Sequence, residues 1–162
     1  MKQLNNVSLV CIDCVNHGAA LAAIKNSLKE INVDKALFFT DRYFKIEGVE
    51  VVVIPKIDSK DSYSHFLIKE IYKYIDTDFI ITIQHDGWII CGDAWSDEFY
   101  EYDYIGAKWL YIDHRNVGNG AVSFRSKKLL NALGTDDFIE ITPPCDEIIG
   151  RLCARDRIPP LA

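Results

Sequence analysis

Aspartates follow three of the apolar segments in the sequence, at points where predicted β-strands end. Asp13 closes VSLVCI, Asp41 follows ALFFT, and Asp86 comes shortly after DFIITI. If these strands are parallel, their carboxyl ends meet at one edge of the sheet, where open α/β sheets bind ligands. Carboxylates gathered there suit a divalent cation or a hydroxyl-rich ligand. Asp86 is the strongest candidate because the neighbouring Gly87 lets a bulky ligand approach the backbone. The alternative is an ordinary turn in which Asp86 accepts hydrogen bonds from backbone amides.

The elements that would carry these residues alternate between short apolar strands and amphipathic helices. Runs rich in branched and aromatic residues predict strands, and three- and four-residue apolar spacing predicts helices. The predicted strands are 7–13, 36–40, 49–55, 78–87, 103–107 and 121–125. The predicted helices are about 19–31, one from about 62, 126–134, and one from about 146. This order predicts one α/β domain over residues 1–162, with a mostly parallel central sheet flanked by helices.

Local signals predict where the helices begin and end. Asp61 or Ser62 is expected to cap the helix that starts near 62, and Ser126 to cap the helix after 121–125. Gly134 is expected to end that second helix. Residues 118–120, Gly-Asn-Gly, are expected to form a turn before the strand.

Composition limits the classes of protein that fit. With 49% hydrophobic and 26% charged residues, the chain lies far from the composition of disordered proteins. The net charge of −6 argues against nucleic acid as the main partner. No apolar run approaches the roughly 18 to 20 residues that cross a bilayer, and no signal-peptide pattern begins the sequence, so a cytoplasmic location is expected. Cys11 and Cys14 form a CxxC without a second such pair, and we interpret them as buried thiols rather than a zinc site.

Three sequence motifs together resemble a known family. The segments are QHDG (84–87), DYIGAKW (103–109) and VGNGAVSFRSKKLL (117–130). The first resembles a reduced form of the DxD motif of GT-A-type glycosyltransferases. The other two are similar to the DYIGAPW and GNGGFSLRS signatures of a small family of bacterial and viral proteins of that type. The resemblance runs from about 7 to 151, with two departures, Lys108 in place of Pro and Ala121 in place of a second Gly.

The resemblance implies a GT-A-like fold, a nucleotide-sugar donor such as a UDP-sugar, and Mn²⁺ or Mg²⁺. It implies that Asp86 holds the metal on the donor diphosphate and that Lys69 offsets the charge that develops on the leaving group. Base, ribose and sugar contacts would come from Asp13, Asn16, Asp41, Arg42, Asn119 and Gly120. For Lys69 a solvated helix lysine is the alternative, and for 118–120 a simple structural turn.

The acceptor side is also implied by the resemblance. Asp146 would take the proton from an acceptor hydroxyl, on a glycan or another molecule, if the anomeric centre inverts. Glu147 and Trp109 would contact the acceptor. Asp146 and Glu147 have an alternative role as acidic residues that satisfy a helix amino terminus. Alternation along the strand places His85 opposite Asp86, so His85 is expected to pack or form hydrogen bonds rather than share a metal.

Two other functions remain open at this point. Many GT-A enzymes carry a further metal ligand, often histidine, after the last helix, whereas this sequence has no histidine after His114. Three explanations are open: a missing carboxyl-terminal segment, a metal completed by water and phosphate, or lost catalysis. A non-catalytic nucleotide- or glycan-binding module of the same fold is therefore the first alternative. A protein-interaction domain that uses the acidic and aromatic stretch DAWSDEFYEY is the second.

Overall fold

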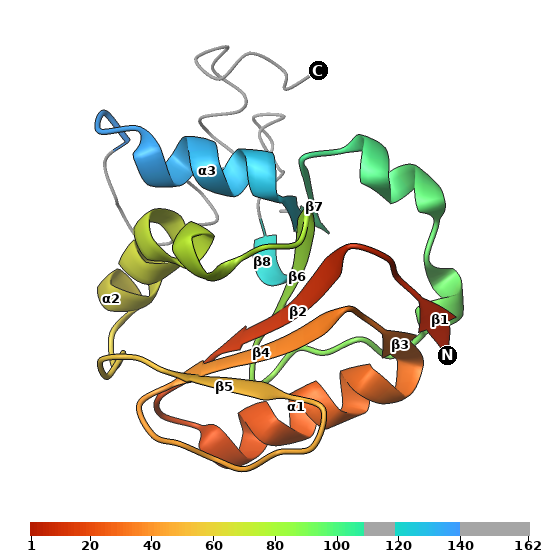
Figure 1. The fold of residues 1–162 in the computed structure, drawn as a ribbon, viewed down its shortest axis with the longest axis horizontal. Coiled ribbons are helices and arrows are strands. Elements are labelled where there is room, and N and C mark those ends of the chain that lie inside the picture. The colour runs from red at the N-terminus through yellow and green to blue at the C-terminus, as the bar shows by residue number, and fades with distance from the viewer. Residues whose placement is uncertain (109–118, 140–162) are drawn as a thin grey trace.

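The computed structural model describes residues 1–108 and 119–139, which form an α/β fold around a six-stranded sheet (Figure 1). The strands are β1 Lys2–Gln3, β2 Val7–Ile12, β3 Ile31–Asn32, β4 Lys35–Thr40, β5 Glu50–Val53, β6 Phe79–Ile83, β7 Tyr104–Ala107 and β8 Asn119–Ser126. The α-helices are α1 His17–Glu30, α2 Lys60–His65 and α3 Lys127–Thr135. Shorter turns are the π-helical η1 Phe66–Glu70 and the 3₁₀ segments η2 Ile71–Tyr74, η3 Gly92–Ala94 and η4 Asp97–Glu101.

The strand order in the main sheet is β5-β4-β2-β6-β8-β7. β2 pairs in parallel with both β4 and β6, and β4 pairs in parallel with β5. β8 runs antiparallel to its neighbours β6 and β7. The short strands β1 and β3 form a separate parallel pair. The predicted mostly parallel sheet flanked by helices is therefore confirmed.

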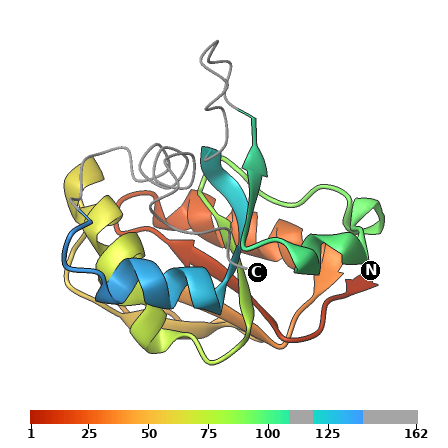
Figure 2. The same ribbon diagram turned by 90° about the horizontal axis from the view of Figure 1, so that it is seen from above.

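Helices cover both faces of the sheet (Figures 1 and 2). On one face, α1 packs over alternate residues of β2 such as Leu9 and Cys11, and the aromatic residues of the 95–100 segment join this apolar cluster. On the other face, α2, η1, η2 and α3 pack over Val10 and Ile12. Every residue of β2 is buried, as expected for a central parallel strand. Cys11 and Cys14 are buried free thiols in different clusters, which agrees with the interpretation that they are structural.

The helix ends differ from the predictions in informative ways. Ser59, rather than Asp61 or Ser62, caps α2: its hydroxyl accepts from the Ser62 amide at 3.1 Å, while the Ser62 hydroxyl accepts from the Ser59 amide at 3.3 Å. This reciprocal capping box starts the helix earlier than predicted. α1 begins at His17, two residues earlier than predicted. It ends at Glu30, because Ile31 pairs with β1.

The prediction for the start of α3 is confirmed, and the prediction for its end is wrong. The Ser126 hydroxyl accepts from the Leu129 amide at 3.0 Å, as a helix cap should. Gly134 does not end the helix, which continues to Thr135. A Cβ at 134 would lie 2.2 Å from the Tyr72 ring, so glycine is required there for packing against η2. In residues 1–108 and 119–139, no helix is long and apolar enough to cross a membrane.

The predicted glycine-rich turn is wrong for its last two residues. Asn119 and Gly120 are the first residues of β8, and Asn119 pairs with Ala107 across a register shift in β7. Because it pairs with β7, the strand begins at Asn119, two residues before the predicted start at 121. Gly118 and the predicted helix near 146 lie outside the described residues.

Candidate functional site

A pocket of about 510 Å³ lies at the carboxyl ends of β2 and β6. The chain builds β2, β4 and β5 in one direction across the sheet and then places β6 on the other side of β2. Ligands of doubly wound sheets bind where the strand order reverses in this way, because the loops diverge there and leave a crevice. Three segments line the pocket, namely 12–16 after β2, 57–64 around the start of α2, and 84–85 after β6.

Asp13 organises the loop that follows β2. One carboxylate oxygen, Oδ1, accepts hydrogen bonds from the amides of Val15 at 2.8 Å and Asn16 at 2.5 Å. The other oxygen, Oδ2, lies 3.1 Å from Nδ1 of His85, and the Asp13 side chain is only 8% exposed. Asp13 thus lies at the predicted place, but its oxygens already have protein partners. Asp13 therefore shapes the pocket wall and contacts His85, and its predicted role in donor binding stays a prediction.

His85 and Asn16 present polar groups in the pocket wall. Asn16 Nδ2 lies 3.4 Å from His85 Nε2, and the His85 side chain is 39% exposed. The prediction that His85 forms hydrogen bonds is therefore confirmed, and Asn16 lies in the pocket lining as predicted. The sequence reasoning did not select His85 as a pocket residue. Its position beside the end of a buried strand was the signal that could have found it.

The third wall of the pocket comes from the start of α2. Tyr63 lines the pocket, and its hydroxyl accepts a hydrogen bond from the Gln84 side chain at 3.3 Å. Like His85, Tyr63 was not among the residues that the sequence predicted for the site. Cys14 also lines the pocket, and burial raises the pKa of its thiol. Since the thiolate is the nucleophilic form, Cys14 belongs to the apolar lining and is not an activated nucleophile.

Asp86 lies at the tip of a tight turn beside the pocket. Gln84 and Gly87 exchange two backbone hydrogen bonds of 3.1 Å each, and Asp86 between them is exposed. No group of three or more His, Cys, Asp or Glu side chains in the described part of the chain is arranged to hold a metal ion. A single exposed carboxylate nevertheless fits Mg²⁺ or Mn²⁺ chemistry, because such ions often take one or two carboxylates and complete their coordination with phosphate oxygens and water.

Asp41 and Arg42 lie at the carboxyl end of β4 but do not line the pocket. Asp41 Oδ1 is 2.6 Å from Nε2 of His17, and both side chains are 16% exposed. The bond to His17, and more weakly Arg42 with its Nε 3.6 Å away, lowers the pKa of Asp41. The His17 ring also contacts Phe44, with ring centroids 5.5 Å apart. Asp41 therefore ties the start of α1 to the end of β4, and the geometry does not place it or Arg42 where they would contact a ligand in the pocket.

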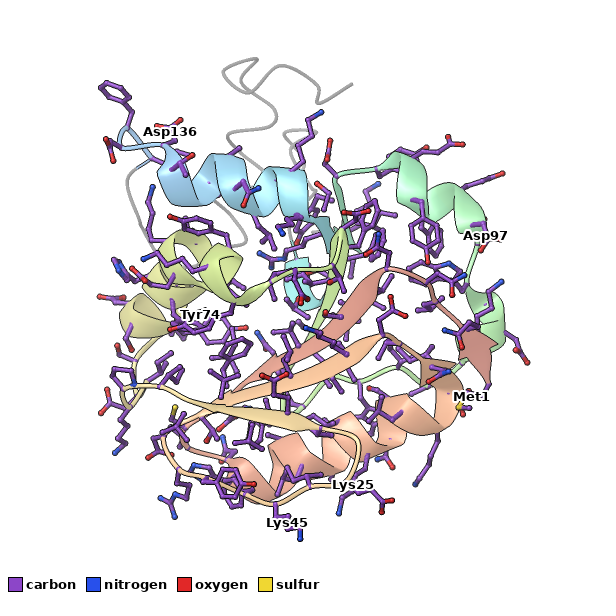
Figure 3. The ribbon with its side chains drawn as sticks, viewed as in Figure 1. Met1, Lys25, Lys45, Tyr74, Asp97 and Asp136 are labelled. Carbon is purple, nitrogen blue, oxygen red and sulfur yellow. The ribbon has the colours of Figure 1, made fainter. Side chains whose placement is uncertain are left out.

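Lys69 does not point to a diphosphate site. Its ammonium donates to the backbone carbonyl of Leu133 at 3.0 Å and to that of Asp136. Figure 3 shows Asp136 just past the end of α3. The last carbonyls of a helix lack partners within the helix, and a cation placed there satisfies them and interacts favourably with the helix dipole. These bonds place Lys69 at the end of α3 and outside the pocket lining, so the geometry gives its predicted diphosphate role no support.

Asn119 and Gly120 are part of the β7–β8 ladder, away from the pocket lining. Asn119 Oδ1 accepts from the Ala121 amide at 3.2 Å, and its carbonyl accepts from the Tyr104 hydroxyl at 3.0 Å. The geometry therefore does not place the Asn119 amide for a donor sugar. Three predicted acceptor-side residues, Trp109, Asp146 and Glu147, lie outside the described residues.

The strand order and the pocket define a doubly wound α/β domain with its cleft at the switch point of the sheet. Residues 48–144 match the family described as "Protein of unknown function (DUF5672)". Because this match covers more than half of the chain, the protein belongs to that family. A search of curated proteins found no match. The matched range includes Tyr63, Gln84, His85 and Asp86, whereas Asp13 and Asn16 precede it.

Proposed function

We propose that this protein is a metal-dependent glycosyltransferase that binds a nucleotide-sugar donor, UDP-sugar first among the candidates, in the pocket between β2 and β6. The observation that carries the proposal is the position of the pocket at the switch point, with the polar group of Asp13, Asn16 and His85 in its wall. A volume of about 510 Å³ falls within the range of small-molecule sites.

The residues that line the pocket suggest which part of the donor each would bind. Asn16, Tyr63 and His85 would bind the nucleoside part of the donor, and the loop that Asp13 organises would hold its ribose side. Asp86, at the turn beside the pocket, would hold Mn²⁺ or Mg²⁺ against the diphosphate. A bound divalent cation would neutralise charge on the departing nucleoside diphosphate. The carboxylate that deprotonates the acceptor hydroxyl remains the sequence prediction Asp146.

The proposal is tested by ligand binding before turnover. A thermal-shift panel of UDP, GDP, CDP and ADP, each with and without Mn²⁺, should show a rise of about 5 to 10 °C in Tm for the correct nucleotide at 100 times its Kd. We expect that rise to need the metal. Asp86→Asn should remove the metal-dependent part of the rise and leave the unliganded Tm unchanged, because Asp86 is exposed.

Asp93→Asn is the matched control, since Asp93 is another exposed aspartate close along the chain, in η3. It should bind nucleotide and metal as the wild type does. Equal affinity with and without metal would remove Asp86 and the cofactor from the proposal. If the protein binds the nucleotide sugar but transfers the sugar neither to an acceptor nor to water, the result would support the non-catalytic binding module instead. No binding of any nucleotide would overturn both functions.

A further inference from the structure

The two ring nitrogens of His85 contact partners of opposite hydrogen-bonding character. Nδ1 lies 3.1 Å from the Asp13 carboxylate, which can only accept a hydrogen bond. Nε2 lies 3.4 Å from Nδ2 of Asn16, an amide nitrogen that can only donate. A proton on Nδ1 and a lone pair on Nε2 suit both contacts, because the carboxylate then faces a proton and the amide faces a lone pair.

The Asp13 carboxylate is held in place, so its second oxygen keeps facing Nδ1 of His85. Its Oδ1 is held by the amides of Val15 and Asn16, and its side chain is almost fully buried. His85 is the more exposed partner and lines the pocket. At 3.4 Å the contact between Asn16 and His85 is long for a hydrogen bond, so a ligand can replace it and meet both an acceptor, the Nε2 lone pair, and a donor, the Asn16 amide.

We propose that Nε2 of His85 accepts a hydrogen bond from the nucleoside part of the ligand, and that Asp13 is a positioning residue that fixes the tautomer. The proposal rests on the proposed function above, because it takes the pocket to be the nucleotide site. The ligand group must be a donor, either a ribose hydroxyl or a ring N–H. Asn16 would then donate to a neighbouring acceptor on the same ligand.

Two substitutions of His85 separate this role from a purely structural one. In His85→Asn, the amide nitrogen can occupy the place of Nδ1 and donate to Asp13, but nothing remains at the place of Nε2. In His85→Gln, the longer side chain reaches the place of Nε2 with an oxygen that can accept. Calorimetry with UDP and Mg²⁺ at constant pH should show about a 5- to 10-fold weaker Kd for His85→Asn and a change of less than about 3-fold for His85→Gln.

A structural role predicts the reverse order, because only the asparagine keeps a donor beside the Asp13 carboxylate. Under that role His85→Gln would lower the Tm, and His85→Asn would bind UDP normally. His65→Asn is the matched control: His65 lies on α2 with a side chain that is 57% exposed, and its Nε2 is 3.6 Å from Glu70. It should change neither the Kd nor the Tm.

Asp13→Asn tests the tautomer directly. The asparagine oxygen can still accept from the amides of Val15 and Asn16, which turns its NH₂ group towards Nδ1 of His85. Nδ1 must then accept, so the proton moves to Nε2 and the ring presents a donor to the pocket. Nitrogen-15 NMR of the ligand-free, metal-free protein should report the Nδ1–H form in the wild type and the Nε2–H form in Asp13→Asn. The UDP affinity of Asp13→Asn should fall about as much as that of His85→Asn.

Modified nucleotides identify the donor group. If a ring N–H bonds to Nε2, 3-methyl-UDP should bind the wild type more weakly than UDP, but should bind His85→Asn about as well as UDP does. If a ribose hydroxyl bonds to Nε2, 2′-deoxy-UDP or 3′-deoxy-UDP should behave in that way. Wild-type protein that binds no nucleotide would overturn the proposed function and this inference with it. Nucleotide binding that is equal in the wild type and His85→Asn, or an Nε2–H tautomer in the wild type, would overturn this inference alone.

Discussion

Two edges of the molecule carry motif residues that suggest ligand binding, and the structure uses them differently. At the carboxyl ends of β2 and β6, Asn16 and His85 line an open pocket. At the β7–β8 edge, the Tyr104 hydroxyl bonds to the Asn119 carbonyl, and the Asn119 side chain bonds to the Ala121 amide. The first edge keeps polar groups accessible, whereas the second uses them to join two strands. A glycine- and asparagine-rich motif can therefore reflect strand pairing as well as ligand contact.

Gly106 gives the sharpest test of that difference. A Cβ at this position would lie 2.3 Å from the Asn119 carbonyl oxygen, a backbone atom that cannot move without disturbing the ladder. Gly106→Ala should therefore lower the free energy of unfolding by about 2 to 3 kcal/mol. Urea denaturation measures this loss. If the β7–β8 edge instead contacts the donor, the variant would keep its stability and lose affinity for the nucleotide sugar.

Gly18→Ala is the control for adding a methyl group to a glycine. Gly18 lies in the first turn of α1, and a Cβ there would meet no atom within 4 Å. We expect this variant to gain up to about 1 kcal/mol of stability, since alanine restricts the unfolded chain more than glycine does. A loss comparable to that of Gly106→Ala would show that the close approach to Asn119 is not the cause.

Lys69 extends the comparison to a residue that sequence reasoning assigned to the ligand. Because its ammonium bonds to the carbonyls at the end of α3, Lys69→Met should lower the free energy of unfolding by about 1 to 2 kcal/mol. The nucleotide affinity at a temperature where the variant is folded should stay within about 2-fold of the wild type. A large loss of affinity with unchanged stability would restore Lys69 to the diphosphate site. Lys128→Met, at an exposed position on α3, is the matched control for affinity.

The smallest expected effect concerns Asp41, whose pKa lies below its ordinary value of 3.8 mainly because of its bond to His17. A carboxyl whose pKa is lower in the folded state adds stability above its ordinary pKa, and this contribution is lost as the pH falls through the folded-state pKa. Asp41→Asn should therefore lower the Tm by about 1 to 3 °C at pH 6, and the difference from the wild type should shrink towards pH 3. Nucleotide affinity at pH 7 should not change. A difference that is constant with pH would show that the charge of Asp41 contributes nothing to stability.

Local patterns in the sequence were sufficient for most of the fold. Apolar runs predicted all six strands of the main sheet, and the Ser126 cap was predicted at the correct residue. These features depend on neighbours in the chain, through side-chain alternation and through hydrogen bonds that span three residues. The start of α2 was missed although its capping box, Ser59 with Ser62, is local, but two other missed boundaries have distant partners. Gly134 stays helical because Tyr72 packs on it, and Asn119 is a strand residue because it pairs with Ala107.

The candidate site divides in the same way. The sequence by itself placed Asp13, Asp41 and Asp86 at the ends of strands, because strand ends depend on neighbours in the chain. Only the tertiary structure decided which partners those residues meet: His85 reaches Asp13 across 72 positions of the chain because β2 and β6 are adjacent parallel strands. Other tertiary contacts pair Asp41 with His17, because β4 is the other neighbour of β2, and place Lys69 of η1 beside the end of α3. A polar side chain becomes a ligand group only when no other part of the folded chain has already satisfied it, and that depends on contacts between residues far apart in the sequence.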